Sequence, residues 1–309
     1  MGNPLKLYII GNGFDLHHEM PSRFTQFYEW LGSKDFIFAE ELDTKYSVRD
    51  KEWWKDFENN LSQLSVSTVL SSHSNLFSTK EYNDFTYRHL YRIEDTIKDD
   101  LENDYVKLRG YFREWIVSLP AGKMSCKIDI DESDAVFLTF NYTDTLQKLY
   151  KIPDEKILHV HGKIQGEDTE LIFGHGDNYD NIVSNSSDED DDFPTIEAIE
   201  VICQHIYDLR KPVEEIININ KEFFLDLIKI NTIYVYGFSF SNIDKPYIRE
   251  IVNHIDILNV DWVISYHSDI DKEKAQEMLE SLKIPSSKYK FIVLKEMQHK
   301  WMKELPFKD

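Results

Sequence analysis

The start of the chain constrains the fold more than any other part of the sequence. An apolar run from Leu5 to Ile10 is stopped by Gly11-Asn12-Gly13. A short run that is apolar at all but one position is typical of a strand buried on both faces of a parallel sheet, rather than of a half-exposed antiparallel strand. The two glycines allow a tight turn into a following helix. The first residues therefore predict the opening strand and turn of an α/β sheet.

Short apolar runs and segments of helical periodicity alternate from residue 134 onward. We expect strands at 5–10, 135–140, 156–160, 171–173, 232–236, 261–266 and 289–294, and helices at 143–150, 194–209, 213–230, 244–255 and 272–282. Strands that alternate with helices imply crossover connections and a mostly parallel sheet. The expected fold class is a Rossmann-like α/β fold, with flanking helices on a mostly parallel sheet and a helical insertion.

The region between the first and second expected strands has helical rather than strand periodicity. After a helix at 23–31, helical patterns dominate from 52 to 119, and 85–119 predicts one long helix or two in series. We therefore expect a single α/β domain over 1–309, with 45–130 a mainly helical insertion. A run of acidic residues, Asp188 to Asp192, places a solvated acidic loop at 178–194.

Composition excludes several classes of function. The formal net charge of −21 argues against binding to a phosphate backbone, which depends on Lys and Arg. No stretch approaches the ~20 apolar residues that span a bilayer, so no membrane partner is expected. The N-terminus carries no export signal, and Cys126 and Cys203 do not suggest a disulfide framework. We expect a cytoplasmic protein with reduced thiols.

Small or reactive residues follow most of the expected strands. Ligands of open parallel sheets bind at the carboxyl ends of the strands, so residues at those ends are candidates for a ligand site. They are Gly11, Asn12 and Gly13 after the first strand, Asn141, His161 and His175 after later ones, Gly237 with Ser239 after 232–236, and His267 after the strand that follows. This convergence predicts a nucleotide-binding crevice.

The segment Gly11 to Asp15, GNGFD, is a weak motif when taken alone. Leu16 stands where the dinucleotide fingerprint has its third glycine, and no acidic residue ends a second strand about 20 residues on, which disfavours an ordinary dehydrogenase. Two glycines still let a phosphate or ribose approach the backbone. The alternative is an ordinary strand-to-helix turn.

Asn141, Ser241 and Asp244 each have a structural and a functional interpretation. Asn141 can cap the following helix, or its carboxamide can bind ribose hydroxyls or orient a water. Ser241 and Asp244 can cap the helix after 232–236 or contact a ligand. Both interpretations stay open from sequence. A serine hydrolase is excluded because Ser239 does not lie in a G-x-S-x-G elbow.

The histidines allow two kinds of chemistry. His159 and His161 are two apart in an expected strand, so they share a face and, together with His175, could bind a divalent metal. Gly162 follows His161 and places it at the strand end, which favours His161 as a general base. His159 fits a structural role better. We expect no bound metal.

Five motifs together resemble the bacteriophage abortive-infection AbiH family. They are GNGFDLHHEMP, FNYTDTL, HVHG, FGHGD and YGFSFSNID, and in this order they cover most of the chain. More distantly, they resemble the sirtuin-like NAD-binding domains. In those domains a GAG loop corresponds to Gly11 and Gly13, the Asn of an N-Y-D motif to Asn141, the H-G catalytic base to His161, and a G-x-S loop to Gly237 and Ser239. This chain has Asn12 in place of the Ala, Thr143 in place of the Asp, and no four-cysteine zinc module.

The resemblance implies antiphage defence and hydrolysis of the nicotinamide–ribose bond of NAD. The alternatives are a nucleotide-sensing module without turnover and a metal-dependent hydrolase using His159, His161 and His175. A homo-oligomer or a defence-system partner is possible in either case. On this hypothesis Asn141 and His161 are catalytic, and NAD contacts the remaining site residues: Gly11, Asn12, Gly13, Phe14, Asp15, His175, Gly237, Ser239 and Asp244.

Overall fold

Six of the expected strands form one sheet in the computed structural model, which describes residues 5–77, 87–164, 171–184 and 192–297. They are β1 (Lys6–Ile10), β2 (Ala135–Thr139), β3 (Ile157–His159), β4 (Thr232–Tyr236), β5 (Asp261–Ser265) and β6 (Tyr289–Ile292). The order is β3-β2-β1-β4-β5-β6, and every neighbouring pair is parallel. The predicted Rossmann-like α/β class is confirmed.

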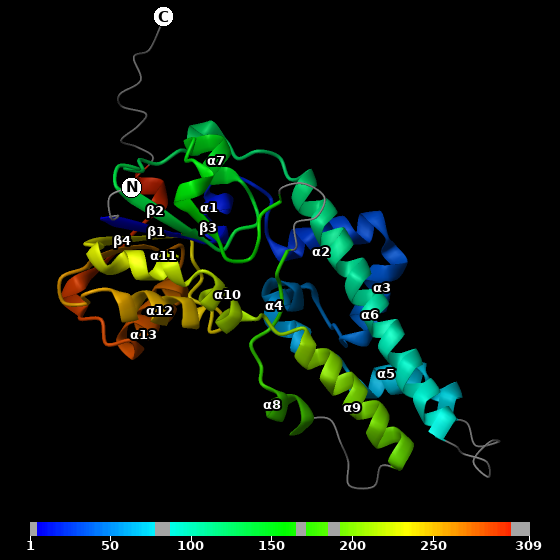
Figure 1. The fold of residues 1–309 in the computed structure, drawn as a ribbon. Helices are drawn as coiled ribbons and strands as arrows, with labels where there is room; N and C mark the ends of the chain where they lie inside the picture. The colour runs from blue at the N-terminus through cyan, green and yellow to red at the C-terminus, as the bar shows by residue number, and fades with distance from the viewer. Residues whose placement is uncertain (1–4, 78–86, 165–170, 185–191, 298–309) are drawn as a thin grey trace, which may run out of the picture. The chain divides into compact units, whose positions relative to one another are not determined.

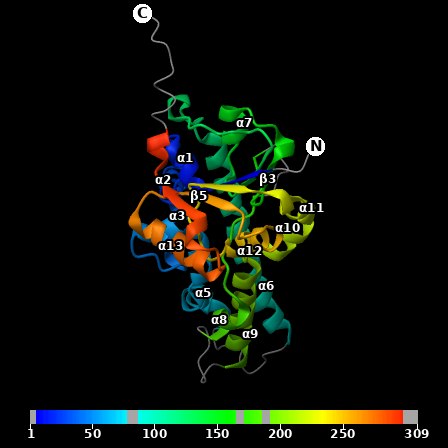
Figure 2. The ribbon, with the colours of Figure 1, turned by 90° about the vertical axis from the view of Figure 1, so that its left-hand side faces the viewer.

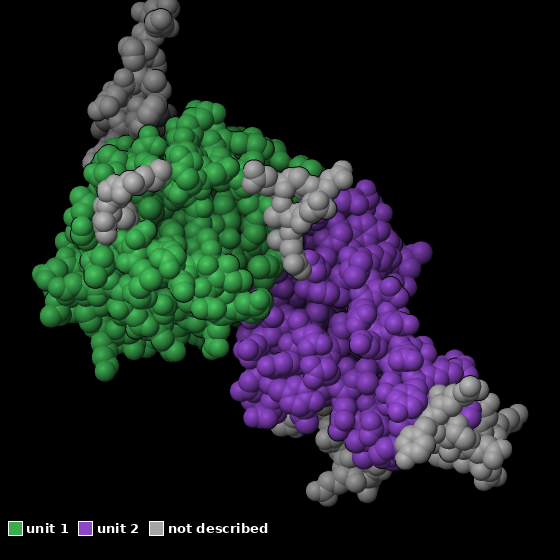
Figure 3. Space-filling model, in the orientation of Figure 1, with its two compact units in different colours: residues 1–23, 116–172, 212–309 green, residues 24–115, 173–211 purple. Residues whose placement is uncertain are grey.

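The chain divides into two units, each made of separate stretches of sequence (Figure 3). Residues 1–23, 116–172 and 212–309 contain the sheet and are called the sheet unit. Residues 24–115 and 173–211 contain helices and are called the helical unit. The helical unit thus takes two segments of chain, whereas the sequence suggested one insertion at 45–130. The single-domain assignment stays a prediction.

Helices cover both faces of the sheet (Figure 1). Leu7, Ile9 and their neighbours on β2, β4 and β5 pack against α10 (Val213–Ile219), α11 (Lys221–Leu225), α12 (Lys245–His254) and α13 (Asp269–Ser281). Tyr8 and Ile10 point to the opposite face, where α1 (Asn12–His17) and α7 (Thr145–Tyr150) contribute Phe14 and Leu146 to a second core. Figure 2 shows the two helical layers from the side. Burial of both faces explains why the strands are largely apolar on both sides.

The helical unit is built around aromatic side chains. Phe27 and Trp54 pack edge to face at 6.1 Å between ring centroids, and Phe112 and Phe173 at 5.0 Å. Residues 87–118 form one long helix, which agrees with the first of the two predicted forms. The helices involved are α2 (Phe24–Lys34), α3 (Phe36–Lys45), α4 (Phe57–Asn60), α5 (Val66–Ser72), most of α6 (Tyr87–Ser118), α8 (Tyr179–Ser184) and α9 (Phe193–Asp208).

The strand predicted at 171–173 is wrong. These residues have no strand pairing: the amide of Ile172 donates to His161 O at 2.9 Å, and the ring of Phe173 packs among aromatic residues of the helical unit. A three-residue apolar run does not by itself specify a strand, and here its burial is satisfied by helix side chains. The nearest pairing is an isolated bridge between His175 and Arg210.

Two other segments depart from prediction. The helix expected at 213–230 is broken at Asn220, whose side-chain amide donates to Ile216 O at 2.8 Å, as Asn does at helix ends. The expected acidic loop at 178–194 contains helix α8, and Asp192 caps α9 by accepting from the Thr195 amide. Residues 185–191, with most of the acidic run, lie outside the described residues.

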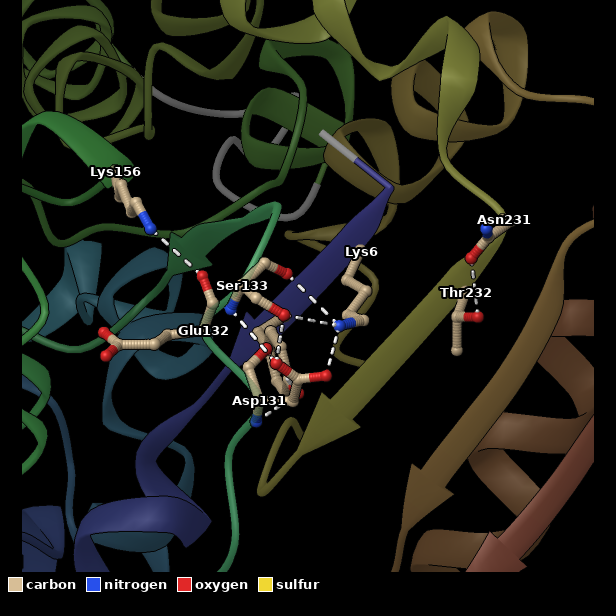
Figure 4. A network of polar contacts seen from close by, with 8 residues as sticks. Lys6, Asp131, Glu132, Ser133, Lys156, Asn231 and Thr232 are labelled. Carbon is tan, nitrogen blue, oxygen red and sulfur yellow. Dashed lines mark hydrogen bonds and ion pairs between the residues drawn. The ribbon is translucent and has the colours of Figure 1, made fainter. Parts of the chain in front are cut away.

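The amino ends of the strands carry exposed polar contacts (Figure 4). Lys6 pairs with Asp131 and also donates to Ser133 O at 3.2 Å, while Lys156 donates to Glu132 O at 3.0 Å. Across the described residues, no helix is both long enough and apolar enough to cross a membrane.

Candidate functional site

The strand order places a topological switch point between β1 and β4. From β1 the chain proceeds to β2 and β3 on one side, and it returns to β4 on the other side of β1. Ligands of open α/β sheets bind at the carboxyl ends of the strands that flank such a point. Gly11 directly follows β1 and Gly237 directly follows β4, so both glycines lie at the switch point.

Gly11, Gly13 and Gly237 allow the two loops at the switch point to touch. A Cβ on Gly237 would lie 2.0 Å from Phe14 N, and one on Gly13 would lie 2.7 Å from Gly237 Cα. Gly237 also has φ of +66°, which favours glycine. The amides of Gly11, Gly13 and Phe14 donate to Tyr236 O, Gly237 O and Gly11 O. These amides therefore do not form the phosphate cradle expected from sequence.

Asn12 and Phe14 are held by the protein itself. Asn12 is exposed, but its amide donates to Ser22 O at 2.8 Å and its Oδ1 accepts from Ser22 Oγ at 2.6 Å. Phe14 is fully buried in the core, 4.6 Å from the ring of His18. Phe14 therefore packs α1 onto the sheet, and its predicted contact with NAD stays a prediction.

Asp15 is a buried carboxylate with a complete set of donors. It is 1% exposed, and Thr143 and Thr145 each donate a hydroxyl to it at 2.6 Å. Desolvation raises the pKa of Asp15 to about 6, against hydrogen bonds from both threonines and Asn141 that lower it. Helix capping does not explain Asp15, because Gly11 occupies the N-cap of α1. Asp15 instead joins α1 to Thr143 and to the first residue of α7.

Asn141 has an orientation that its neighbours fix. Its Nδ2 donates to Gly11 O at 3.1 Å, and its amide also faces the Asp15 carboxylate. Both partners only accept, so the nitrogen must face them. Oδ1 is buried and, among the described residues, has no hydrogen-bond partner. The capping interpretation fails because α7 begins at Thr145 with Asp144 as its N-cap. Asn141 therefore presents an unsatisfied acceptor at the switch point.

His161 lies just beyond β3, buried to 3% exposure. Its Nδ1 lies 3.2 Å from Phe140 O and must donate, because a carbonyl oxygen only accepts. Its Nε2 lies 3.4 Å from Oδ1 of Asp244. Asp244 occupies the N-cap position of α12 without a side-chain capping bond. His161, the predicted base, therefore lies beside Asp244, which was predicted to contact the ligand.

Both ring nitrogens of His159 make hydrogen bonds within the protein. Its Nδ1 donates to Asn141 O at 3.1 Å, and its Nε2 accepts from Gln147 Nε2 at 3.0 Å. Burial lowers the pKa of His159 to about 4, so the ring is neutral near pH 7. Its hydrogen bonds hold the backbone at Asn141 in place.

His175 belongs to the helical unit, apart in the chain division from Asn141 and His161. It is fully buried, donates from Nε2 to Ile206 O at 2.7 Å, and accepts from the Asp177 amide at Nδ1. Burial lowers its pKa. Within the described ranges, no group of three His, Cys, Asp or Glu side chains is arranged to hold a metal ion.

The structure adds hydroxyl side chains that the sequence interpretation missed. Thr139 accepts from the amide of Asn141 at 3.1 Å, and Ser265 accepts from the amide of Gly237 at 2.8 Å. Thr143 and Thr145 hold Asp15. Three of these four lie within four residues of Asn141, which was the signal available in the sequence. Ser239, by contrast, is exposed.

Comparison with known proteins gives one match. The family model described as "Bacteriophage abortive infection AbiH" matches residues 7–266, which includes β1, the loops around Asn141 and His161, and β5. No curated protein and no solved structure matches the chain. Because the match covers most of the sequence, the chain belongs to the bacteriophage abortive infection AbiH family.

Proposed function

We propose that the switch-point edge of the sheet binds NAD and hydrolyses its nicotinamide–ribose bond. The observation that carries the proposal is the buried Oδ1 of Asn141, an acceptor without a donor among the described residues. A buried acceptor left unsatisfied is costly, and a sugar hydroxyl would satisfy it. Family membership supports the wider role, which is abortive-infection defence against bacteriophage.

The residues fit one part of a dinucleotide better than another. A ribose hydroxyl could donate to Asn141 Oδ1, whose orientation is fixed by Gly11 and Asp15. A pyrophosphate finds less support at the glycine turn, since three of its amides donate internally and α1 has only six residues. Recognition of the nicotinamide ribose, rather than of the phosphates, is therefore the core of the proposal.

Hydrolysis needs a nucleophile, a leaving group and a proton acceptor. Nicotinamide leaves with the electron pair of its bond to the anomeric carbon and is then neutral. A water oxygen forms the new bond to that carbon and gives up one proton. His161 would accept this proton, while Asn141 would hold the sugar in place as positive charge develops on it. The products are ADP-ribose, nicotinamide and the released proton.

Release of nicotinamide from NAD by the full-length chain tests this proposal. We expect release by the native protein, assayed both purified and in cells infected with phage. His161→Ala and Asn141→Ala should each reduce the rate at least ~100-fold. His254→Ala, at a partly exposed histidine in the last turn of α12 of the same unit, serves as the matched control and should leave it unchanged. Silence of the native protein in both settings, or full activity of His161→Ala, contradicts the proposal.

Binding without turnover is the second candidate. Both ring nitrogens of His161 already face protein oxygens, at 3.2 and 3.4 Å, as they would in a group that only supports the site. Titration calorimetry with ADP-ribose separates the two functions. Binding that depends on Asn141, with no nicotinamide released from NAD, would favour a sensing module.

A further inference from the structure

We propose that Gln147 is a second ligand-binding residue at the carboxyl edge of the sheet, and that its Oε1 accepts a hydrogen bond from the adenosine half of NAD. The inference rests on the proposed function, in which Asn141 holds the ribose of the nicotinamide half. The observation that carries it is a second buried acceptor. Among the described residues, the Oε1 atom of Gln147 has no hydrogen-bond partner.

Hydrogen bonds fix the direction in which the Gln147 amide points. His159 Nδ1 must donate to Asn141 O at 3.1 Å, because a carbonyl oxygen only accepts. The neutral ring then has a lone pair at Nε2, which accepts from Gln147 Nε2 at 3.0 Å. The second hydrogen of the same amide nitrogen goes to Asp154 Oδ1 at 2.9 Å. Both amide hydrogens of Gln147 are thus used, and its oxygen faces neither partner.

The carboxylate of Asp154 keeps the amide in this orientation. Lys163 donates to the same oxygen, Asp154 Oδ1, at 2.7 Å. The hydrogen bonds from Lys163 and from Gln147 lower the pKa of Asp154, so its carboxylate is ionised near neutral pH. Because an ionised carboxylate only accepts, a rotated Gln147 amide would bring two oxygens together. The Oε1 atom of Gln147 therefore stays without a donor.

The strand register places Gln147 at the same edge of the sheet as Asn141. His159 is the last residue of β3, and it pairs with Thr139, the last residue of β2. Asn141 follows Thr139 by two residues, and the ring of His159 joins the Asn141 backbone to the Gln147 side chain. Neighbouring strands lie ~4.8 Å apart, so the edge from β1 to β3 is ~10 Å wide. A dinucleotide is long enough to extend along this edge, whereas one ribose is not.

The chemistry of the free oxygen defines the group that it binds. An amide oxygen accepts, so its partner must be a donor, either a sugar hydroxyl or the exocyclic amine of adenine. The adenosine half of NAD carries both groups, and its ionised phosphates carry neither. A buried acceptor without a donor is costly, which favours a ligand that supplies one. Asn141 and Gln147 would thus hold opposite halves of the same ligand.

Titration calorimetry of the full-length chain with ADP-ribose tests the role of Gln147. Gln147→Leu, which removes the amide, should weaken binding ~10-fold, as expected for the loss of one neutral hydrogen bond. Gln276→Leu is the matched control and should bind like the native protein, because Gln276 is an exposed glutamine of α13 that also donates to a carboxylate. If Gln147→Leu does not fold, Gln147→Ala keeps a good helix former in α7 and gives the same comparison. An unchanged affinity would overturn the proposal.

Two altered ligands separate a direct contact from a loss of support for His159. One lacks the 2′ and 3′ hydroxyls of the adenosine ribose, and the other carries hypoxanthine in place of adenine. With the ligand that lacks the group bound by Gln147, Gln147→Leu should bind no more weakly than the native protein, and the loss should persist with the other. An equal loss with all three ligands would show that Gln147 only supports the site, and would overturn the proposal.

Asn141→Ala in the same titrations tests the proposed function separately. If the native chain binds ADP-ribose through Asn141 and Gln147→Leu binds it equally well, only the role of Gln147 is overturned. If the native chain does not bind ADP-ribose, the roles of both residues are overturned.

Discussion

An aspartate at the carboxyl edge of the sheet and one at the amino edge differ in exposure, and their pKa values are shifted in opposite directions. At the carboxyl edge, Asp15 is 1% exposed and desolvation raises its pKa to about 6. At the amino edge, the side chain of Asp131 is 60% exposed, and hydrogen bonds from Lys6 and Ser133 lower its pKa to about 2. Burial disfavours the ionised form of Asp15, whereas the adjacent Lys6 stabilises the ionised form of Asp131.

The two kinds of polar group differ in what they cost the folded protein. Exposed ion pairs such as Lys6–Asp131 are easily accommodated and contribute little to folding. Buried polar groups such as Asp15, Asn141 and His161 are expensive to hold, and groups of perturbed charge cluster at functional sites. The carboxyl edge therefore carries buried polar groups that are costly to hold, and the amino edge carries a solvated ion pair.

Substitution of Gly237 should give the largest effect on folding. In Gly237→Ala the new Cβ meets Phe14 N at 2.0 Å at a residue with φ of +66°, so the loops after β1 and β4 must separate. We expect a loss of about 4 kcal/mol or more in chemical denaturation. Gly110→Ala, where the added Cβ meets no atom within 4 Å, should instead be neutral or slightly stabilising. Equal stabilities of the two variants would show that the glycines do not pack the carboxyl edge.

Asp15 should make stability fall as pH rises. Its pKa is higher in the folded state, about 6 against 3.8, so its contribution is full below pH 4 and is lost as pH rises through 6. Relative to Asp15→Asn, the native protein should lose about 2 kcal/mol of unfolding free energy between pH 4 and 7. Urea denaturation of both proteins across this range measures the difference. A difference independent of pH would mean that Asp15 is not desolvated.

Asp131 should change stability less than Asp15 does, and its contribution should grow rather than fall as pH rises. Its pKa is lower in the folded state, so its contribution is present above pH 4 and is lost as pH falls through about 2. Because the pair is exposed, Asp131→Asn should lower stability by less than about 1 kcal/mol at pH 7. Added salt should reduce this difference further. If Asp131→Asn lost as much stability as Gly237→Ala, the two edges of the sheet would not differ as described.

The sheet could be predicted from the sequence because its strands are buried on both faces. Runs such as 233–236 contain only aliphatic and aromatic residues, so their assignment as strands does not depend on knowing which face is covered. Residues that follow parallel strands lie at one edge of the sheet. Asn141, His161 and Gly237 were therefore expected just beyond the ends of strands, where the structure has them. Strand 171–173 failed because Phe173 is buried by aromatic residues from distant helices, which no local pattern reveals.

The finer parts of the site depended on contacts between distant loops. The glycines suggested an approach to phosphate, but whether a glycine faces a ligand or another backbone is decided by its partner loop, here Gly237 against Gly13. Asp15 and Asp244 could be read as caps, because a short polar side chain after a strand suits both roles. Their partners, Thr143, Thr145 and His161, lie about 80 to 130 residues away in sequence.

A crystal structure of the full chain with ADP-ribose decides whether Asn141 binds a ribose. We expect electron density at the carboxyl ends of β1 and β4, with a ribose hydroxyl within hydrogen-bond distance of Asn141 Oδ1. The same soak of Asn141→Ala, run as the control, should show no ordered nucleotide. Nucleotide bound elsewhere on the native chain, with Asn141 Oδ1 still lacking a donor, would contradict the account.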